Sequence, residues 1–168
     1  MDCTARLREK RAAIELMQKG EEALAEGRMN EAVGLLERAL KEVPGDYAGQ
    51  LLMARYHLTA KRGADAFRHA RLAQEIYPSE PQCWFVGGMA ALAQKRYDTA
   101  YESFHRYESM LAGNPNTIFY EGRSLEGLGR KEESAERYNR YLQSGGAEGE
   151  NAEYARQRLI EWGYIKAA

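Results

Sequence analysis

The sequence predicts an all-α protein, an α-solenoid of four stacked helix pairs followed by a C-terminal capping helix. Small residues recur at intervals of 34 residues in two registers, and no segment shows the alternation of apolar and polar residues that a half-buried strand requires. The first register holds Ala32, Ala66, Ala100 and Ser134, and the second holds Gly20, Ala54, Gly88 and Gly122. Units of this length with two helical segments bury their apolar faces only by stacking on one another.

Within each unit, two antiparallel helices can approach closely where small side chains face each other. We therefore expect Gly20 to face Ala32 and Gly88 to face Ala100. Glycines in the turns 26–28, 61–63 and 128–130 are expected to end the first helix of a pair by taking a positive φ. Larger residues repeat at two further positions and should fill the space toward the next unit: Leu36, Ala70, Phe104 and Tyr138, and then Ala39, Ala73, Tyr107 and Tyr141.

With these residues the chain resembles the tetratricopeptide repeat family, over four contiguous units at residues 13–46, 47–80, 81–114 and 115–148. Leu16 and Gln50 depart from the family pattern, which favours an aromatic residue at that position. The resemblance implies a single domain over residues 1–168 and a right-handed superhelix, with the first helix of each pair lining its concave side. The third unit has the strongest signature, in Trp84, Gly88, Ala91, Ala100 and Phe104.

Both ends of such a stack need cover, because a terminal repeat leaves one apolar face without a neighbour. We predict a capping helix at about residues 151–162, with one apolar face. At the front, residues 2–11 are expected to extend the first helix, with their charged side chains in solvent. The buried face of the capping helix should carry Ala152, Ala155, Leu159 and Trp162.

Composition fits one soluble helical domain of 168 residues, since 44% of the residues are apolar and 29% are charged. The formal net charge of −1 gives no general attraction to nucleic acid or to an anionic membrane. No apolar run approaches the roughly 20 residues that span a bilayer, so no membrane insertion is expected. The compartment stays open between the cytoplasm and a bacterial periplasm.

The sequence offers no catalytic, cofactor or metal motif, so we expect no enzyme activity, no cofactor and no metal site. His57, His69 and His105 lack the spacing of metal ligands. His57 is expected to be packed and hydrogen-bonded, and the other two histidines to lie in solvent. Cys3 and Cys83 are interpreted as free thiols, because neither belongs to a CxxC pair.

The concave side is the candidate binding site that remains. The repeat period places three rows of residues on the side of the first helices that faces away from the partner helix. The first row is wholly apolar, and a large exposed apolar row either binds something or is covered by another part of the protein. The rows are Met17, Leu51, Phe85 and Phe119, then Glu21, Arg55, Met89 and Arg123, then Leu24, Leu58, Leu92 and Glu126.

We therefore predict a protein or peptide partner in a groove. Some tetratricopeptide domains hold chaperone C-termini with a clamp of lysines and asparagines, and this chain lacks that clamp. Arg55 and Arg123 would instead offer bidentate contacts to an acidic group of the partner. The alternative is that the apolar row is part of the core. The predicted groove set is Met17, Leu51, Arg55, Leu58, Phe85, Met89, Leu92, Phe119 and Arg123.

Two other functions remain open. The last third of the chain is similar to the tetratricopeptide tails of some bacterial zinc metallopeptidases, in residues 114–116, 126–130 and 158–164. That resemblance implies a non-catalytic domain that gathers substrate or regulates a larger periplasmic enzyme, and no catalytic residue carries over. The third function is weak homo-oligomerisation, through the groove or through an uncovered end.

Overall fold

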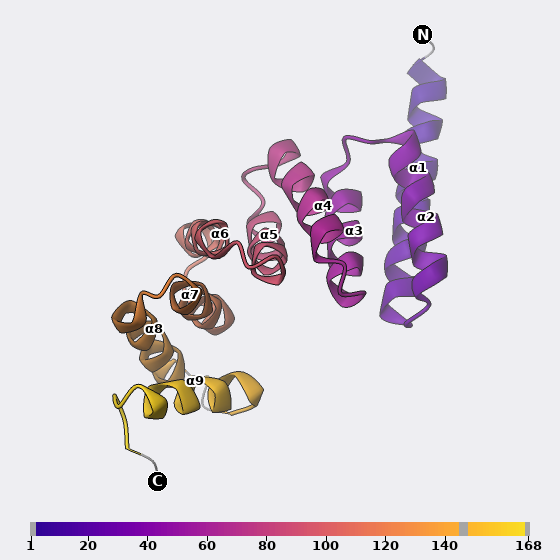
Figure 1. Cartoon of the computed structure of the whole chain (residues 1–168). Helices are drawn as coiled ribbons and strands as arrows, with labels where there is room; N and C mark the ends of the chain where they lie inside the picture. Colours follow the sequence, from indigo (N-terminus) through magenta and orange to yellow (C-terminus); the bar gives the residue numbers. More distant parts are fainter. Residues whose placement is uncertain (1–2, 145–147, 167–168) are drawn as a thin grey trace. The chain divides into compact units, whose positions relative to one another are not determined.

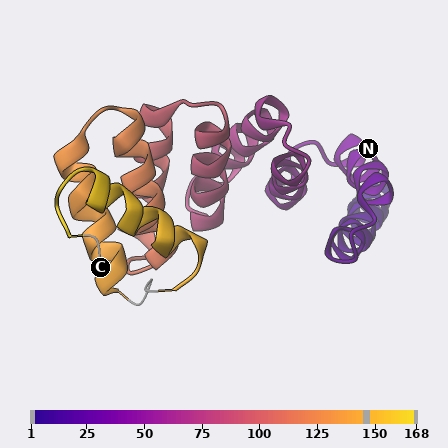
Figure 2. The same cartoon turned by 60° about the horizontal axis from the view of Figure 1, so that its bottom comes forward.

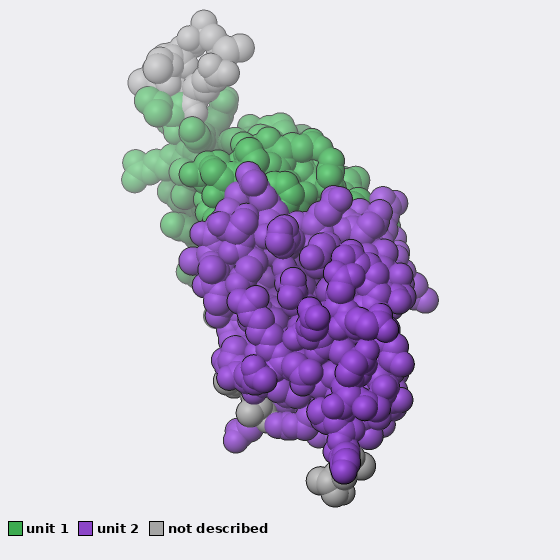
Figure 3. Space-filling model, turned by 90° about the vertical axis from the view of Figure 1, so that its left-hand side faces the viewer, with its two compact units in different colours: residues 1–86 green, residues 87–168 purple. Residues whose placement is uncertain are grey.

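The computed structural model describes residues 3–144 and 148–166, and in that part of the chain it contains nine α-helices and no strand. They form two compact units, Met1–Val86 and Gly87–Ala168, with the boundary inside α5 (Figure 3). The helices, labelled in Figure 1, are α1 (Cys3–Ala25), α2 (Met29–Glu42), α3 (Tyr47–Thr59), α4 (Gly63–Ile76), α5 (Pro81–Ala93), α6 (Tyr97–Met110), α7 (Pro115–Gly127), α8 (Lys131–Gln143) and α9 (Glu150–Glu161).

In the first unit, α1 pairs with α2 and α3 pairs with α4, while α2 and α3 pack together (Figure 1). Asp46 caps α3 by accepting a hydrogen bond from the Gly49 amide at 3.0 Å. The small residues of the repeat, Ala32, Ala54 and Ala66, are fully buried. One core cluster of this unit consists of Ala13, Met17, Leu36, Ala39, Leu52 and Met53.

The turns within the pairs follow the prediction at Gly27 and Gly129, whose φ angles are 76° and 74°. They differ from it at residues 61–63, where Lys61 takes the positive φ of 57° and Gly63 begins α4. Lys95 takes the same conformation between α5 and α6. A lysine can occupy this position because its side chain is exposed and the strain is confined to one residue.

Of the register glycines, Gly88 and Gly122 meet large rings, whereas Gly20 meets the Leu36 side chain and, at 3.6 Å, the Ala32 carbonyl. A Cβ atom on Gly88 would lie 2.7 Å from the Phe104 ring, and one on Gly122 would lie 2.7 Å from the Tyr138 ring. Ser134 donates a hydrogen bond to the Gly122 carbonyl at 2.8 Å, which ties α8 to α7. Small residues are therefore needed here because an aromatic side chain of the paired helix lies against the backbone.

Gln50 replaces the aromatic residue of the repeat and keeps one of its contacts. In α5, the Trp84 indole donates to the Pro78 carbonyl at 2.7 Å. One repeat earlier, the Gln50 amide donates to the Pro44 carbonyl at 3.0 Å. The departure from the family pattern therefore preserves the link between the helix and the turn that precedes it.

The second unit ends in the predicted cap, since α9 packs against α8 (Figures 1 and 2). Ala152, Ala155 and Leu159 are fully buried. They complete an apolar cluster with residues of the two preceding helices, α7 and α8. Its other buried members are Ile118, Phe119, Ala135, Tyr138 and Tyr141.

Candidate partner-binding surface

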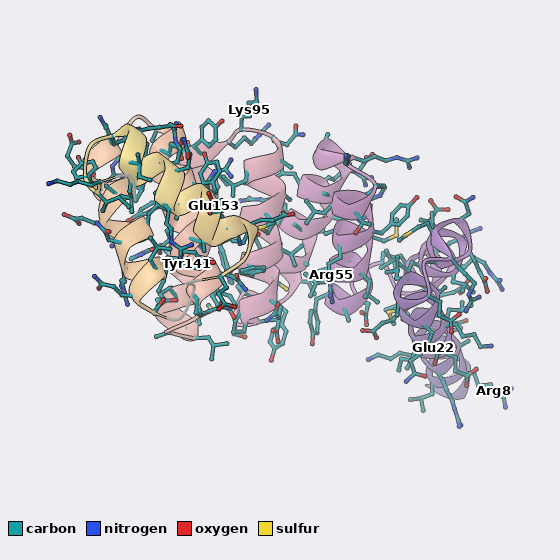
Figure 4. The ribbon with its side chains drawn as sticks, turned by 90° about the horizontal axis from the view of Figure 1, so that it is seen from below. Arg8, Glu22, Arg55, Lys95, Tyr141 and Glu153 are labelled. Carbon is teal, nitrogen blue, oxygen red and sulfur yellow. The ribbon has the colours of Figure 1, made fainter. Side chains whose placement is uncertain are left out.

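The predicted groove residues of the first unit lie mainly on α3. Leu51 and Leu58 are half-buried, and Arg55, labelled in Figure 4, is exposed. Met17 of α1 is only 8% exposed and belongs to the apolar core. Since the first two repeats pack around it, Met17 must be removed from the predicted groove set.

Phe119 must be removed for a similar reason. It is 1% exposed, and its ring centroid lies 5.2 Å from that of Tyr141 and 6.0 Å from that of Tyr154 on α9. The alternative that part of the apolar row is core therefore holds at both ends of the row. Phe85, Met89 and Leu92 are half-buried.

α9 also contacts Arg123 and Glu126, the last residues of the second and third predicted rows. The guanidinium of Arg123, which remains exposed, lies 4.2 Å from the centre of the Tyr154 ring. Glu126 accepts hydrogen bonds from the hydroxyls of Tyr138 at 2.6 Å and Tyr154 at 3.0 Å, and its carboxylate pairs with Arg158 at 2.6 Å. Burial is the main cause that raises the pKa of both tyrosines. This face of α7 is therefore occupied by the chain itself.

A different situation holds between α1 and α3, where a pocket of about 270 Å³ opens. Arg55 and Glu21 both line it, and neither forms an ion pair with any residue in the described part of the chain. The three predicted rows of residues could not locate this pocket, because its unfilled volume depends on how the neighbouring helices pack. The lining consists of Glu21, Leu24, Ala25, Met29, Leu52, Arg55, Tyr56 and Thr59.

A second hollow, of about 480 Å³, lies between α2, α3 and α4 and contains His57 and His69. The two rings stack with centroids 5.3 Å apart, and His69 shares a 2.7 Å hydrogen bond with Gln50. The expectation that His69 lies in solvent is wrong, because Gln50 supplies a polar partner inside the core. His57 is buried as expected, but its Nδ1 atom has no hydrogen-bond partner in the structure.

Burial lowers the pKa of His69 to about 4, with smaller contributions from Arg68 and His57 that exceed the opposing effect of Asp65. The neutral ring is therefore the native form. In the unfolded chain the pKa of a histidine is about 6.5. The contribution of His69 to the free energy of unfolding should therefore be fully present above pH 6.5, and it should fall by about 3 kcal/mol as the pH drops toward 4. His57, whose pKa is also lowered by burial, acts in the same direction.

Urea unfolding at several pH values checks this expectation. His69→Gln should flatten the loss of stability between about pH 6.5 and pH 4. Gln94→Ala, at an exposed site away from the histidine pair, is the control and should keep the slope of the unmodified chain. Equal slopes for all three proteins would show that the histidine pair does not govern acid stability.

Glu121 is a buried carboxylate that the sequence did not single out. Its side chain is 4% exposed, its Oε2 atom lies 2.8 Å from Arg137 Nε, and its Oε1 atom lies 3.6 Å from His105 Nδ1. Burial raises its pKa against the opposing charges of Arg137 and His105. Because these residues come from α6, α7 and α8, the cluster joins three helices of the second unit.

Chemical sites are sparse in the described part of the chain. Those residues hold no group of three or more His, Cys, Asp or Glu side chains suited to a metal ion. Cys83 is a buried free thiol whose pKa is raised to about 11 by burial. Among the described helices, none is long and apolar enough to cross a membrane.

Comparison with known proteins agrees with this architecture. The family model described as tetratricopeptide repeat matches residues 23–84, a stretch that runs from the end of α1 into α5. Residues 23–84 are therefore similar to the tetratricopeptide repeat family. No curated protein matches the sequence. The hypothesis that this chain is a non-catalytic domain of a larger bacterial metallopeptidase therefore remains a prediction.

Three solved structures show the same fold as this chain. A structure of MamA AMB-1 has a TM-score of 0.74 at 20% identity, covering 90% of this chain and 82% of that one. The thermophilic TPR protein TTC0263 from Thermus thermophilus has 0.70 at 20% identity, covering 90% and 84%. The first TPR of Spaghetti (RPAP3), bound to the HSP90 peptide SRMEEVD, has 0.69 at 18% identity, covering 71% and 95%. The predicted all-α solenoid class is thus confirmed.

Proposed function

We propose that this protein is an interaction module that binds a segment of a partner protein, without catalysis, on the side of α3 that carries Leu51, Arg55 and Leu58. The pocket between α1 and α3 carries the proposal, because it joins apolar walls to a free arginine and a free carboxylate. A peptide bound to one repeat domain of the same fold supports this use of the architecture. Phe85, Met89, Leu92 and Arg123 retain accessible area and remain candidates for further contacts.

The physical balance favours moderate affinity. Each leucine that passes from half-buried to buried contributes a fraction of the roughly 1.5 to 3 kcal/mol of a full burial. Ordering a flexible segment and losing translational freedom offset much of this gain. We expect a dissociation constant nearer micromolar than nanomolar, with Arg55 adding salt dependence and selectivity.

The test uses a partner recovered by pull-down and identified by mass spectrometry, then titrated by calorimetry. Leu51→Ala combined with Leu58→Ala should weaken binding at least tenfold. Leu72→Ala on α4 is the matched control, because Leu72 is an exposed leucine of the same unit. If the double variant remains folded and binds like the unmodified chain, the α3 surface is not the binding site.

Phe119→Ala is unsuitable for this test. Because Phe119 is buried beneath α9, its truncation should cost about 3 to 5 kcal/mol of stability. A loss of binding in that variant would report unfolding of the second unit rather than a missing contact.

A further inference from the structure

The two stacked histidines of the first unit lie where α3 packs against α4, and the proposed binding surface does not use them. His57 belongs to α3 and His69 to α4, and each is 7% exposed. On α3, Gln50 directly precedes Leu51. His57 directly precedes Leu58, so the buried histidine contact and the proposed surface share one helix. A change that loosens α3 from α4 would therefore reach the partner-binding residues.

Hydrogen bonds hold the His69 ring in one neutral form. The Gln50 amide nitrogen donates to the Pro44 carbonyl, so the Gln50 oxygen is the atom that lies 2.7 Å from His69 Nδ1 and accepts its proton. On the other side of the ring, Arg68 Nη2 lies 3.3 Å from His69 Nε2, and a guanidinium only donates. Nε2 must therefore stay unprotonated. A proton there would set two donors and two positive charges against each other.

The His57 ring is equally unsuited to a positive charge. Its Nδ1 atom is buried without a hydrogen-bond partner, and its ring centroid lies 5.3 Å from that of His69. A charged ring would be a buried cation whose donor is unsatisfied. It would also lie beside a second imidazole that gains a charge at the same acidity.

The other titratable groups around the pair do not compensate for such a charge. They come from α2, from the turn before α4, from α4 and from α3, and they comprise three cations, two carboxylates and one phenol. In the described part of the chain neither carboxylate forms an ion pair with a histidine, and Asp65 pairs with Arg68 at 3.4 Å. The groups are Glu37, Lys41, Arg62, Asp65, Arg68 and Tyr56.

This geometry couples the α3–α4 contact to pH. Burial lowers the pKa of His69 to about 4, and it lowers the pKa of His57 as well. A histidine in an open chain has a pKa of about 6.5. The open form therefore binds more protons than the closed form at pH 5, and acid shifts the equilibrium toward opening. For His69 alone, these two values give a rise of about 20-fold in the opening equilibrium between pH 7 and pH 5.

We propose that mild acid separates α4 from α3 and thereby releases the partner segment from α3, while the second unit stays folded. The inference rests on the proposed function and specifies how the same surface is regulated. Glu121, the buried carboxylate of the second unit, responds in the opposite direction. Burial raises its pKa, so its contribution to stability is lost as the pH rises and not as it falls.

Hydrogen exchange of the full chain tests the opening without any partner. Mass spectrometry at pH 7 and pH 5, corrected for the intrinsic exchange rate of each amide, measures the protection of each helix. We expect the protection of α3 and α4 to fall about 20-fold and that of α7 and α8 to change less than about threefold. Carboxylates with an ordinary pKa of about 4.3 remain charged at pH 5, so surface ion pairs persist. Equal losses in both units, or none in α3 and α4, would overturn the proposal.

Two variants assign the opening to the histidine contact. His69→Gln removes the titrating ring, and Gln50→Glu places a carboxylate where it favours the charged ring. Each should reduce the fall in protection between pH 7 and pH 5 to less than about fivefold. Gln94→Ala, exposed and outside the first unit, should keep the full fall. A full fall in both contact variants would show that another group controls the opening.

The imidazole signals of the unmodified ¹⁵N-labelled chain give a check that needs no variant. At pH 7 the spectrum should show His69 with its proton on Nδ1 and none on Nε2. A His69 ring that titrates near pH 6.5 while α3 and α4 stay protected would reach water without any separation of the helices. That result would contradict the proposal.

Partner binding separates this inference from the function on which it rests. At pH 5 the partner should bind several-fold more weakly than at pH 7, within the roughly 20-fold that His69 supplies. The same comparison in His69→Gln accounts for titration of the partner itself. If affinity depends on Leu51 and Leu58 but not on pH, the surface is correct and acid release is wrong. If α3 and α4 open in acid but the double leucine variant binds normally, the opening is correct and the proposed function fails.

Discussion

Ending the chain before Gly149 should lower the free energy of unfolding by roughly 5 kcal/mol or more and the melting temperature by about 10 °C or more. The cause is the loss of α9, whose Leu159 is fully buried. Its removal would expose the apolar cluster around Phe119 and Tyr138 to water. It would also leave Glu126 without Arg158.

A graded pair of substitutions keeps this expectation interpretable. Leu159→Ala should cost about 2 to 5 kcal/mol, because it removes a buried leucine from a packed cluster. Gln157→Ala on the exposed side of the same helix should stay within about 0.5 kcal/mol. Thermal melts followed by far-ultraviolet circular dichroism measure all three proteins. A truncated chain that melts with the full one would mean that α9 does not cover the fourth repeat in solution.

Two glycine substitutions should act in opposite directions. Gly122→Leu should destabilise the second unit by about 2 to 3 kcal/mol or more, because even a Cβ atom would lie 2.7 Å from the buried Tyr138 ring. Gly34→Ala should instead stabilise the chain by about 0.5 to 1 kcal/mol. Gly34 lies within α2, and nothing lies within 4 Å of the Cβ atom that alanine would add.

Urea unfolding of both variants decides between a packing role and a backbone role for these glycines. If Gly122→Leu unfolds at the same urea concentration as the unmodified chain, the close approach of α7 and α8 is not maintained in solution. If Gly34→Ala destabilises the chain, the open surroundings of Gly34 in the structure are wrong.

The repeat period predicted the helix pairs because it records which residues face the paired helix, and that information is local. It placed Ala32, Ala66 and Gly122 in close contacts that the structure contains. The period does not identify the partner in each contact. We expected Gly88 to face Ala100, and the structure places it against the Phe104 ring. A period gives the face of a helix on which a residue lies, and packing decides what covers that face.

The candidate surface was predicted less completely for the same reason. Met17 and Phe119 have the spacing of groove residues, but a neighbouring repeat and α9 bury them. His69 lies inside because Gln50, one repeat before Trp84, offers it a hydrogen bond across two helices. Pairing between distant side chains and unfilled volume are three-dimensional properties, and a pattern in one sequence contains neither.

The most direct test of the central claim is a titration of the partner's isolated segment into the ¹⁵N-labelled chain, with each amide signal followed. Binding at the proposed surface predicts saturable shifts concentrated on α1 and α3, at Leu24, Leu51, Arg55 and Leu58, that disappear in the double leucine variant. Shifts confined to α2 and α4, around Leu72 and Arg68, would contradict the claim and place the partner on the opposite helices of the pairs.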